Sequence, residues 1–290
     1  MSSFPVFAEP AHHPVIFPVE PGPALLKRLS AIPKLTAVRP ASRLEVRPRP
    51  EMVSAGITEV DALAGGLPRG CLSEICGAAS SGSTSVMLAA LAAATKRQEV
   101  CALVDTMNAF DPTSASAAGM ELARLLWVRC GHKNHSPQRY RDTEKKKESN
   151  FIEKGSSAYR EHESRVEQAL RALDLLLQSG GFGMIAVDFS DVPFQLVRRI
   201  PLASWFRFQR VVENTPTVLL VMARAACAQT CASVVVKLSA VSSRLSVKTS
   251  KPSHAQLFNG LQIEAELLRS RLERKPVQSV RFATTVTRAG

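Results

Sequence analysis

The segment from Gly77 to Ser85, with the sequence GAASSGSTS, has the spacing of a loop that binds phosphate groups. Such loops follow the pattern G-x-x-x-x-G-K-[ST], in which backbone N–H groups and the first turn of a helix hold the phosphates. Gly77, Gly82 and Thr84 occupy the glycine and hydroxyl positions, and Ser83 occupies the lysine position. Because a serine carries no charge, we expect the loop to hold phosphate weakly and not to support efficient hydrolysis.

A second candidate group is Asp188, which ends the apolar run Met184–Asp188. A carboxylate at the end of a buried strand beside a phosphate-binding loop is typical of a Walker B element, which positions Mg²⁺. The alternative is an aspartate that accepts backbone hydrogen bonds at a strand end. We expect no resident metal or cofactor; ATP with Mg²⁺ would bind weakly at most, with Thr84 and Asp188 holding the cation.

The six cysteines show no C-x-x-C spacing, and most lie in apolar runs. We therefore interpret them as buried, reduced thiols of a cytosolic protein. Cys227 and Cys231 would bind a metal only if ligands came from elsewhere in the chain.

These candidate residues lie between segments that alternate between strand and helix patterns. Strands are expected at 71–76, 101–105, 125–130, 183–188, 217–223, 233–240 and 244–249, and helices at 83–96, 114–123 and 166–177. Near-continuous apolar strands that alternate with helices predict an α/β fold, with a mostly parallel sheet covered by helices on both faces. The loop at 77–84 would then lie at the carboxyl edge of the sheet, where ligands bind in such folds.

Composition divides the chain into three parts. Residues 1–50 hold ten of the eighteen prolines, which predicts an extended arm with one short amphipathic turn at 24–29. Residues 51–249 form the expected core, which a charged, flexible insertion at 132–164 interrupts. Residues 250–290 form a basic extension: from residue 237 to the end there are ten Lys and Arg against three Glu, within a total net charge of +12.

Excess positive charge favours a polyanionic partner, nucleic acid first. Two groups could make such contacts, one mixing arginines with an aromatic residue and one in the basic extension: Arg198, Arg199, Trp205 and Arg207, and Arg271, Arg274 and Lys275. The aromatic side chain would stack on bases, contact a protein partner, or pack on the sheet while the arginines face solvent. The basic extension would contact DNA without reading its sequence, or serve as a solvated surface.

Other classes are excluded by composition. With 45% hydrophobic and 21% charged residues, the chain is typical of globular proteins rather than disordered ones. No apolar run reaches the roughly 18 residues of a membrane span, and the proline-rich N-terminus lacks the basic start of a secretory signal. We expect a cytoplasmic protein without a membrane partner.

Several segments resemble RecA, the bacterial recombinase, in order and spacing. They are Ser54–Leu63 and Gly65–Gly70 before the loop, the loop Gly77–Thr84 itself, the run Asp105–Pro112, and Asp188. The resemblance covers roughly residues 54–240 and implies a RecA-like P-loop fold. It places Met107 where RecA has the glutamate that acts as general base, and methionine accepts no proton.

Two further departures concern ligand contacts. RecA has a glutamine that senses the γ-phosphate after the strand similar to 217–223, where this chain has Ala223-Arg224. The long DNA-binding loops of RecA have only short counterparts here, at 190–193 and 225–232. The resemblance therefore implies a pseudo-ATPase without catalytic residues and without the RecA grip on single strands.

A RecA-like core without the lysine, the base and the DNA loops most resembles the ImuA-type mutasome proteins. This resemblance rests on the overall layout, including Leu126–Arg129 and Pro276–Val280. It implies an accessory role in mutagenic translesion synthesis during the SOS response, at the nucleoid after DNA damage. The implied partners are a Y-family-like polymerase homologue and an alternative replicative polymerase, with DNA contact through the basic tail and self-association as further expectations.

Two alternatives to that role stay open. One is a RecA-like, DNA-dependent ATPase or recombinase in DNA repair that takes its missing groups from unconventional positions. The other is a P-loop protein of a pathway unrelated to DNA.

Overall fold

The computed structural model describes residues 24, 27–29, 31–32, 49–131, 151–241, 260–272 and 278–285. The chain divides into two compact units, Met1–Pro48 and Arg49–Gly290. In the first unit, the described residues of the segment 24–29 are helical, where the sequence predicts a short amphipathic turn. Apart from residues 31–32 and 49–50, the remainder of the proline-rich arm lies outside the described residues.

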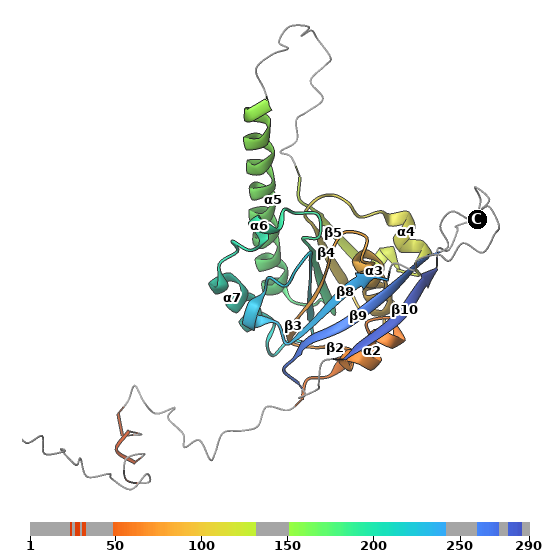
Figure 1. Ribbon diagram of the computed structural model, residues 1–290. Coiled ribbons are helices and arrows are strands. Elements are labelled where there is room, and N and C mark those ends of the chain that lie inside the picture. The colour runs from red at the N-terminus through yellow and green to blue at the C-terminus, as the bar shows by residue number, and fades with distance from the viewer. Residues whose placement is uncertain are drawn as a thin grey trace, which may run out of the picture. The chain divides into compact units, whose positions relative to one another are not determined.

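The second unit is built on an eight-stranded sheet with the order β10-β9-β8-β3-β7-β6-β4-β5 (Figure 1). Six strands run parallel, and the last two in the chain form an antiparallel hairpin that joins the sheet at β8. Their bounds are β3 (Cys71–Gly77), β4 (Cys101–Asp105), β5 (Leu125–Arg129), β6 (Met184–Asp188), β7 (Val218–Ala223), β8 (Val234–Ala240), β9 (Gly260–Ser270) and β10 (Ser279–Thr285). A small separate pair, β1 (Met52–Val53) and β2 (Leu67–Pro68), precedes them.

Helices cover both faces of the sheet, and each face has its own hydrophobic core (Figure 1). On one face Leu63 and Leu91 pack against Ile75, below α2 (Thr58–Ala64), α3 (Ser83–Lys96) and α4 (Pro112–Ala117). On the other face Leu173 and Trp205 are buried below α5 (Phe151–Ser179), α6 (Phe194–Val197) and α7 (Leu202–Val212). Two short 3₁₀ helices, η3 (Leu122–Arg124) and η4 (Gln229–Cys231), complete the described elements. The predicted α/β class, with a mostly parallel sheet between helices, is confirmed.

The predicted elements agree closely with the described ones. Apolar runs of the sequence form β3 to β8, and the helix expected at 83–96 is α3. The helix expected at 114–123 is instead split into α4 and η3, because Gly119 turns the chain with a φ of +84°. The strand expected at 244–249 lies outside the described residues.

Two segments differ from the sequence analysis. The insertion predicted at 132–164 is helical from residue 151 onward, because α5 begins at Phe151 and continues into the amphipathic helix expected at 166–177. Its charges support the helix, since Arg165 and Glu161 form an i,i+4 ion pair at 2.5 Å. Residues 132–150 lie outside the described residues. The basic extension predicted at 250–290 contributes β9 and β10 to the sheet, so the core continues to Thr285.

Among the described residues, no helix combines the length and the apolar character needed to cross a membrane.

Candidate functional site

The predicted phosphate-binding loop connects the carboxyl end of β3 to the first turn of α3. Ser80 and Gly82 have φ angles of +62° and +85°, so left-handed residues alternate with right-handed ones along the turn. That alternation turns successive backbone N–H groups toward one side, as in anion-binding nests. Gly82 is required there, because a Cβ atom at this position would overlap the Cδ1 atom of Ile263 on β9.

Several polar atoms of this loop have no hydrogen-bond partner among the described residues. The Ser81 N–H bonds the Ala78 carbonyl at 3.1 Å, whereas the amides of Ala79, Ser80 and Gly82 have no acceptor in the described part of the chain. Ser81 is 2% exposed, and its hydroxyl oxygen is buried without a hydrogen-bond partner among the described residues. A buried unpaired hydroxyl costs about 1–3 kcal/mol, which a bound acceptor would recover.

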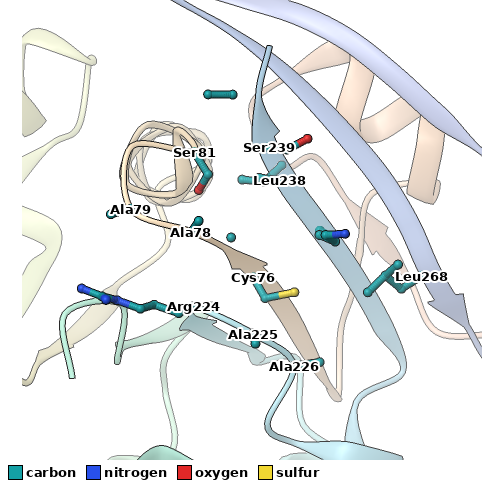
Figure 2. A pocket seen from close by; sticks show the side chains of 13 residues that line it. Cys76, Ala78, Ala79, Ser81, Arg224, Ala225, Ala226, Leu238, Ser239 and Leu268 are labelled. Carbon is teal, nitrogen blue, oxygen red and sulfur yellow. The ribbon is translucent and has the colours of Figure 1, made fainter. Parts of the chain in front are cut away.

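A cavity of about 540 Å³ lies beside the loop (Figure 2). Its walls come from the loop, from the residues that follow β7, and from the end of β8, with Leu268 of β9 closing one side. Small and apolar side chains form most of the lining, and two cationic residues, Arg224 and Lys237, also line it. The cavity has the size of sites that bind small molecules and cofactors.

Arg224 follows directly after β7 and is held toward the Walker B strand. Its Nε donates to the Ser190 carbonyl at 2.8 Å, and the Ser190 N–H donates to the Asp188 Oδ1 at 2.8 Å. Ser190 therefore bridges the cation of Arg224 and the carboxylate of Asp188. Lys237 lies on the other side of the cavity and pairs with Glu266 at 3.8 Å.

The segment after Arg224 is fixed by Glu74, which is fully buried in the middle of β3. The Glu74 Oε1 atom accepts the Cys227 N–H at 2.5 Å and the Ala228 N–H at 3.4 Å. Those bonds tie the connection between β7 and β8 to the strand that carries the phosphate-binding loop. The position of Arg224 thus depends on a buried carboxylate 150 residues earlier in the chain.

Asp188 lies where the sequence predicts it, at the carboxyl end of β6. Burial raises the pKa of its carboxyl group, and the neighbouring carboxylates of Asp191 and Asp105 raise it further. Asp105 is opposite Asp188 in the pairing of β4 with β6. Its carboxylate accepts the N–H groups of Ala109 and Phe110, both at 3.0 Å, and shapes the turn that follows β4.

Met107 is part of that turn, and its side chain is partly buried against the hydrophobic core on the α5 face. It therefore serves packing, and its thioether offers no basic atom to a water molecule. The next residue, Asn108, has a φ of +56° and accepts a hydrogen bond from Arg129 Nε at 2.6 Å. The residue at the position of a general base therefore lies in a tight turn and packs against the core.

The loop residues fit a phosphate ligand better than they fit hydrolysis. Unpaired amides and a buried hydroxyl suit an anion, whereas Ser83 is 8% exposed and brings no charge. Thr84 is exposed on the first turn of α3, and Asp188 ends β6. Because β7 lies between β3 and β6, the axes of β3 and β6 are about 10 Å apart in the sheet. Thr84 and Asp188 would hold Mg²⁺, which would offset phosphate charge if a nucleotide were bound.

The predicted DNA- or partner-binding residues come from two places. Arg198, Arg199 and Arg207 are exposed around α6 and α7, where Arg207 pairs with Asp174 of α5 at 2.6 Å. Trp205 is fully buried in the core below α7, which agrees with the packing interpretation of this aromatic residue. Arg271 is exposed just after β9, and its backbone N–H donates to the Ser233 carbonyl at 2.8 Å. Arg274 and Lys275 lie outside the described residues.

Sequence reasoning did not assign roles to Ser81, Glu74 or Lys237. Two of them carry a signal that was available, because a charged residue interrupts an apolar strand in CLSEIC and in VVVKLSA. Glu74 is buried, and a charged side chain is rarely buried in a strand without a partner, so it marks a tertiary contact that the pattern alone does not identify. Lys237 is exposed and pairs with Glu266 of the neighbouring strand.

The chain is similar to known proteins over its first half. Residues 38–135, about a third of the chain, match the RecA N-terminal domain. The RecA protein of Nostoc sp. PCC 7120 is 47% identical over 81 residues, which cover 28% of this chain and 23% of that protein. RecA of Nostoc punctiforme is 46% identical and RecA of Arthrospira platensis is 44% identical, each over 81 residues.

The chain therefore matches only about a quarter of the length of these curated relatives. Within that part it is RecA-like, and the predicted resemblance to RecA is confirmed there. The fold of the described residues, with its phosphate-binding loop at the carboxyl edge of a mostly parallel sheet, is consistent with a RecA-like fold.

Proposed function

We propose that this protein is a RecA-like accessory factor in DNA damage tolerance that does not turn over ATP. The observation that carries the proposal is the pair of replacements in an otherwise intact scaffold. Ser83 stands at the position of the loop lysine, and Met107 stands at the position of the general base and packs against the core. Loss of either group alone would slow phosphoryl transfer by orders of magnitude.

The connections after β6 and β7 support a role other than strand exchange. Residues 189–193 and 224–233 link these strands to the next elements, and both are tied to the sheet. The Phe189 N–H bonds the Met222 carbonyl at 2.9 Å, and Glu74 holds Cys227 and Ala228. These two described connections are therefore short and anchored, whereas RecA has long DNA-binding loops after the corresponding strands.

A RecA-like segment and a net charge of +12 support a place in DNA repair. Within that field, we propose mutagenic translesion synthesis during the SOS response, with a Y-family-like polymerase homologue and an alternative replicative polymerase as partners. The exposed arginines around α6 and α7 and the residue after β9 offer polar contacts to such partners or to DNA.

One experiment tests the loss of catalysis. ATP turnover would be measured with and without single-stranded DNA for the wild type and for the double variant Ser83→Lys, Met107→Glu. We expect background turnover from the wild type, and Asp188→Asn serves as the control, because turnover that persists in this variant comes from a contaminant. DNA-stimulated turnover by the wild type that Asp188→Asn abolishes would favour the ATPase or recombinase alternative.

A second experiment tests the pathway. A strain without this gene should lose most of its damage-induced mutations while keeping survival by error-free repair, and the tagged protein should retain a translesion polymerase from damaged cells. Unchanged mutation frequency after ultraviolet damage would contradict the proposed pathway and favour a P-loop protein unrelated to DNA.

A further inference from the structure

The loop at the carboxyl edge of the sheet holds several hydrogen-bond donors that have no acceptor among the described residues. Three loop amides and the buried Ser81 hydroxyl have no partner among the described residues. All of them lie at the N-terminus of α3, where the helix dipole adds partial positive charge. Ala79 and Ser80 are exposed, so their amides are open to solvent and to a ligand, whereas the buried Ser81 hydroxyl lacks any hydrogen bond among the described residues unless a ligand supplies one.

Arg224 adds a full positive charge to the same place. Its side chain lines the cavity with Ala78 and Ala79, and Figure 2 shows it reaching below these loop residues. Its Nε bonds a carbonyl, and no carboxylate in the described ranges lies within ion-pair distance of its guanidinium group. A guanidinium near a helix N-terminus is repelled by the dipole, so this position favours a bound anion between them.

Two separate sets of hydrogen bonds hold Arg224 and the residues after it in place. Ser190 connects it to Asp188 on the side of the Walker B strand, and Glu74 fixes the residues that follow it. Position 83 carries no charge, but Arg224, which follows the neighbouring strand β7, brings a positive charge to the same edge of the sheet.

We propose that Arg224 supplies the cation that the loop lacks at Ser83, so that the loop binds the di- or triphosphate group of a nucleotide. This proposal specifies the ligand of the phosphate-binding loop, and it does not depend on the proposed pathway. The phosphate oxygens would accept hydrogen bonds from the amides of Ala79, Ser80 and Gly82 and pair with the guanidinium group of Arg224. The cavity beside the loop, about 540 Å³ with apolar walls, has room for the nucleoside.

Binding without turnover follows from the same geometry. Arg224 approaches from the end of β7 rather than from the first turn of α3, and Met107 packs against the core and offers no basic atom. The guanidinium group of Arg224 offsets the charge of the ligand, but neither residue deprotonates an attacking water molecule. The site would therefore act as a nucleotide sensor rather than as a motor.

Isothermal titration of the full-length protein with ATP and Mg²⁺, and separately with pyrophosphate, tests the proposal. We expect wild-type binding of both, weakened about 10- to 100-fold in Arg224→Ala and largely kept in Arg224→Lys. Arg210→Ala is the matched control, because this arginine is exposed on α7 and does not line the cavity. Thermal melting of each variant verifies that it folds.

The two ligands separate the sources of affinity. Tighter binding of ATP than of pyrophosphate would assign the cavity to the nucleoside, and equal binding would assign the site to the polyphosphate group; both outcomes support the role of Arg224. No binding by the wild type at millimolar ligand, or equal binding by Arg224→Ala and Arg210→Ala, would overturn it. Either failure would leave the accessory role standing, since that role is tested by turnover and by mutation frequency.

Discussion

Substitution of Gly82 by alanine tests whether β9 and the phosphate-binding loop form one packed unit. Gly82 has a φ of +85°, where an alanine costs about 1–2 kcal/mol. Its new Cβ atom would also overlap Ile263, whose Cγ1 atom lies 2.8 Å from that position and whose side chain is fully buried. Overpacking of this kind costs about 1–3 kcal/mol, so we expect a total loss of about 2–5 kcal/mol.

Gly180→Ala separates the two contributions. Gly180 has a similar φ of +66°, but a Cβ atom there would have nothing within 4 Å. Its substitution should therefore cost about 1–2 kcal/mol, the backbone part alone. The free energies of unfolding come from urea titrations of the full-length protein, followed by circular dichroism.

Shortening Ile263 provides a second check. Ile263→Val removes the Cδ1 atom that the new methyl group would overlap, and by itself costs about 0.5–1.5 kcal/mol. In the double variant the two losses should fall short of their sum by about 1 kcal/mol or more. If Gly82→Ala costs no more than Gly180→Ala, or if the double variant is additive, the packing of β9 on the loop is refuted.

Three further predictions concern titratable groups. Burial and like charges raise the pKa of Asp188, so its ionised form opposes folding, and stability falls as the pH rises from about 4 through the folded-state pKa. Asp188→Asn should therefore raise the free energy of unfolding at pH 7 in urea titrations, and a loss of stability would be inconsistent with this reasoning. Although burial opposes it, hydrogen bonds from Arg97 and Arg69 lower the pKa of Glu99. Glu99→Gln should therefore cost about 1–2 kcal/mol at pH 7, and the difference should fade as the pH falls through the folded-state pKa of Glu99; a constant difference would argue against the pairing. Burial raises the pKa of Cys101 to about 12, with Glu99 adding to the shift, so this thiol should react with a disulfide reagent only after unfolding. Rapid reaction of Cys101 in the native protein, detected by mass spectrometry, would contradict its burial.

Much of the fold follows from local pattern. The parallel strands are short apolar runs that end in turns, and six of them lie where that pattern predicts. The loop at 77–84 is recognisable from spacing because glycines at fixed positions are required by the backbone itself, as the φ of +85° at Gly82 illustrates. Residues whose role is set by their own backbone angles are visible in a single sequence.

The remainder depends on contacts between distant segments. β9 alternates polar and apolar residues among charges, as in Gln262, Glu264 and Glu266, so composition suggested a solvated extension rather than a strand. Its other face buries Ile263 and Ala265 against the core. A half-buried strand next to β8 is recognisable only once its neighbour is known.

Arg224 illustrates the same difficulty at the site. In the sequence it occupies the place of a glutamine in RecA, and nothing near it indicates a partner. Its position follows from the strand order, which puts β7 next to β3, and from the hydrogen bonds of Glu74 to residues 227 and 228. No local pattern contains that information, because the bonded groups are more than 150 residues apart.

Two costs in the folded protein occur at the same edge of the sheet. The Ser81 hydroxyl is buried without a partner among the described residues, and the carboxylate of Asp188 is partly buried beside two like charges. Each opposes folding, and a scaffold maintained for stability alone would gain from alanine at the first position and asparagine at the second. One group donates a hydrogen bond and the other carries negative charge, so a phosphate with its cation would satisfy both. Such costs are typical of sites kept for a ligand, and they favour a loop that binds phosphate with serine rather than lysine at position 83.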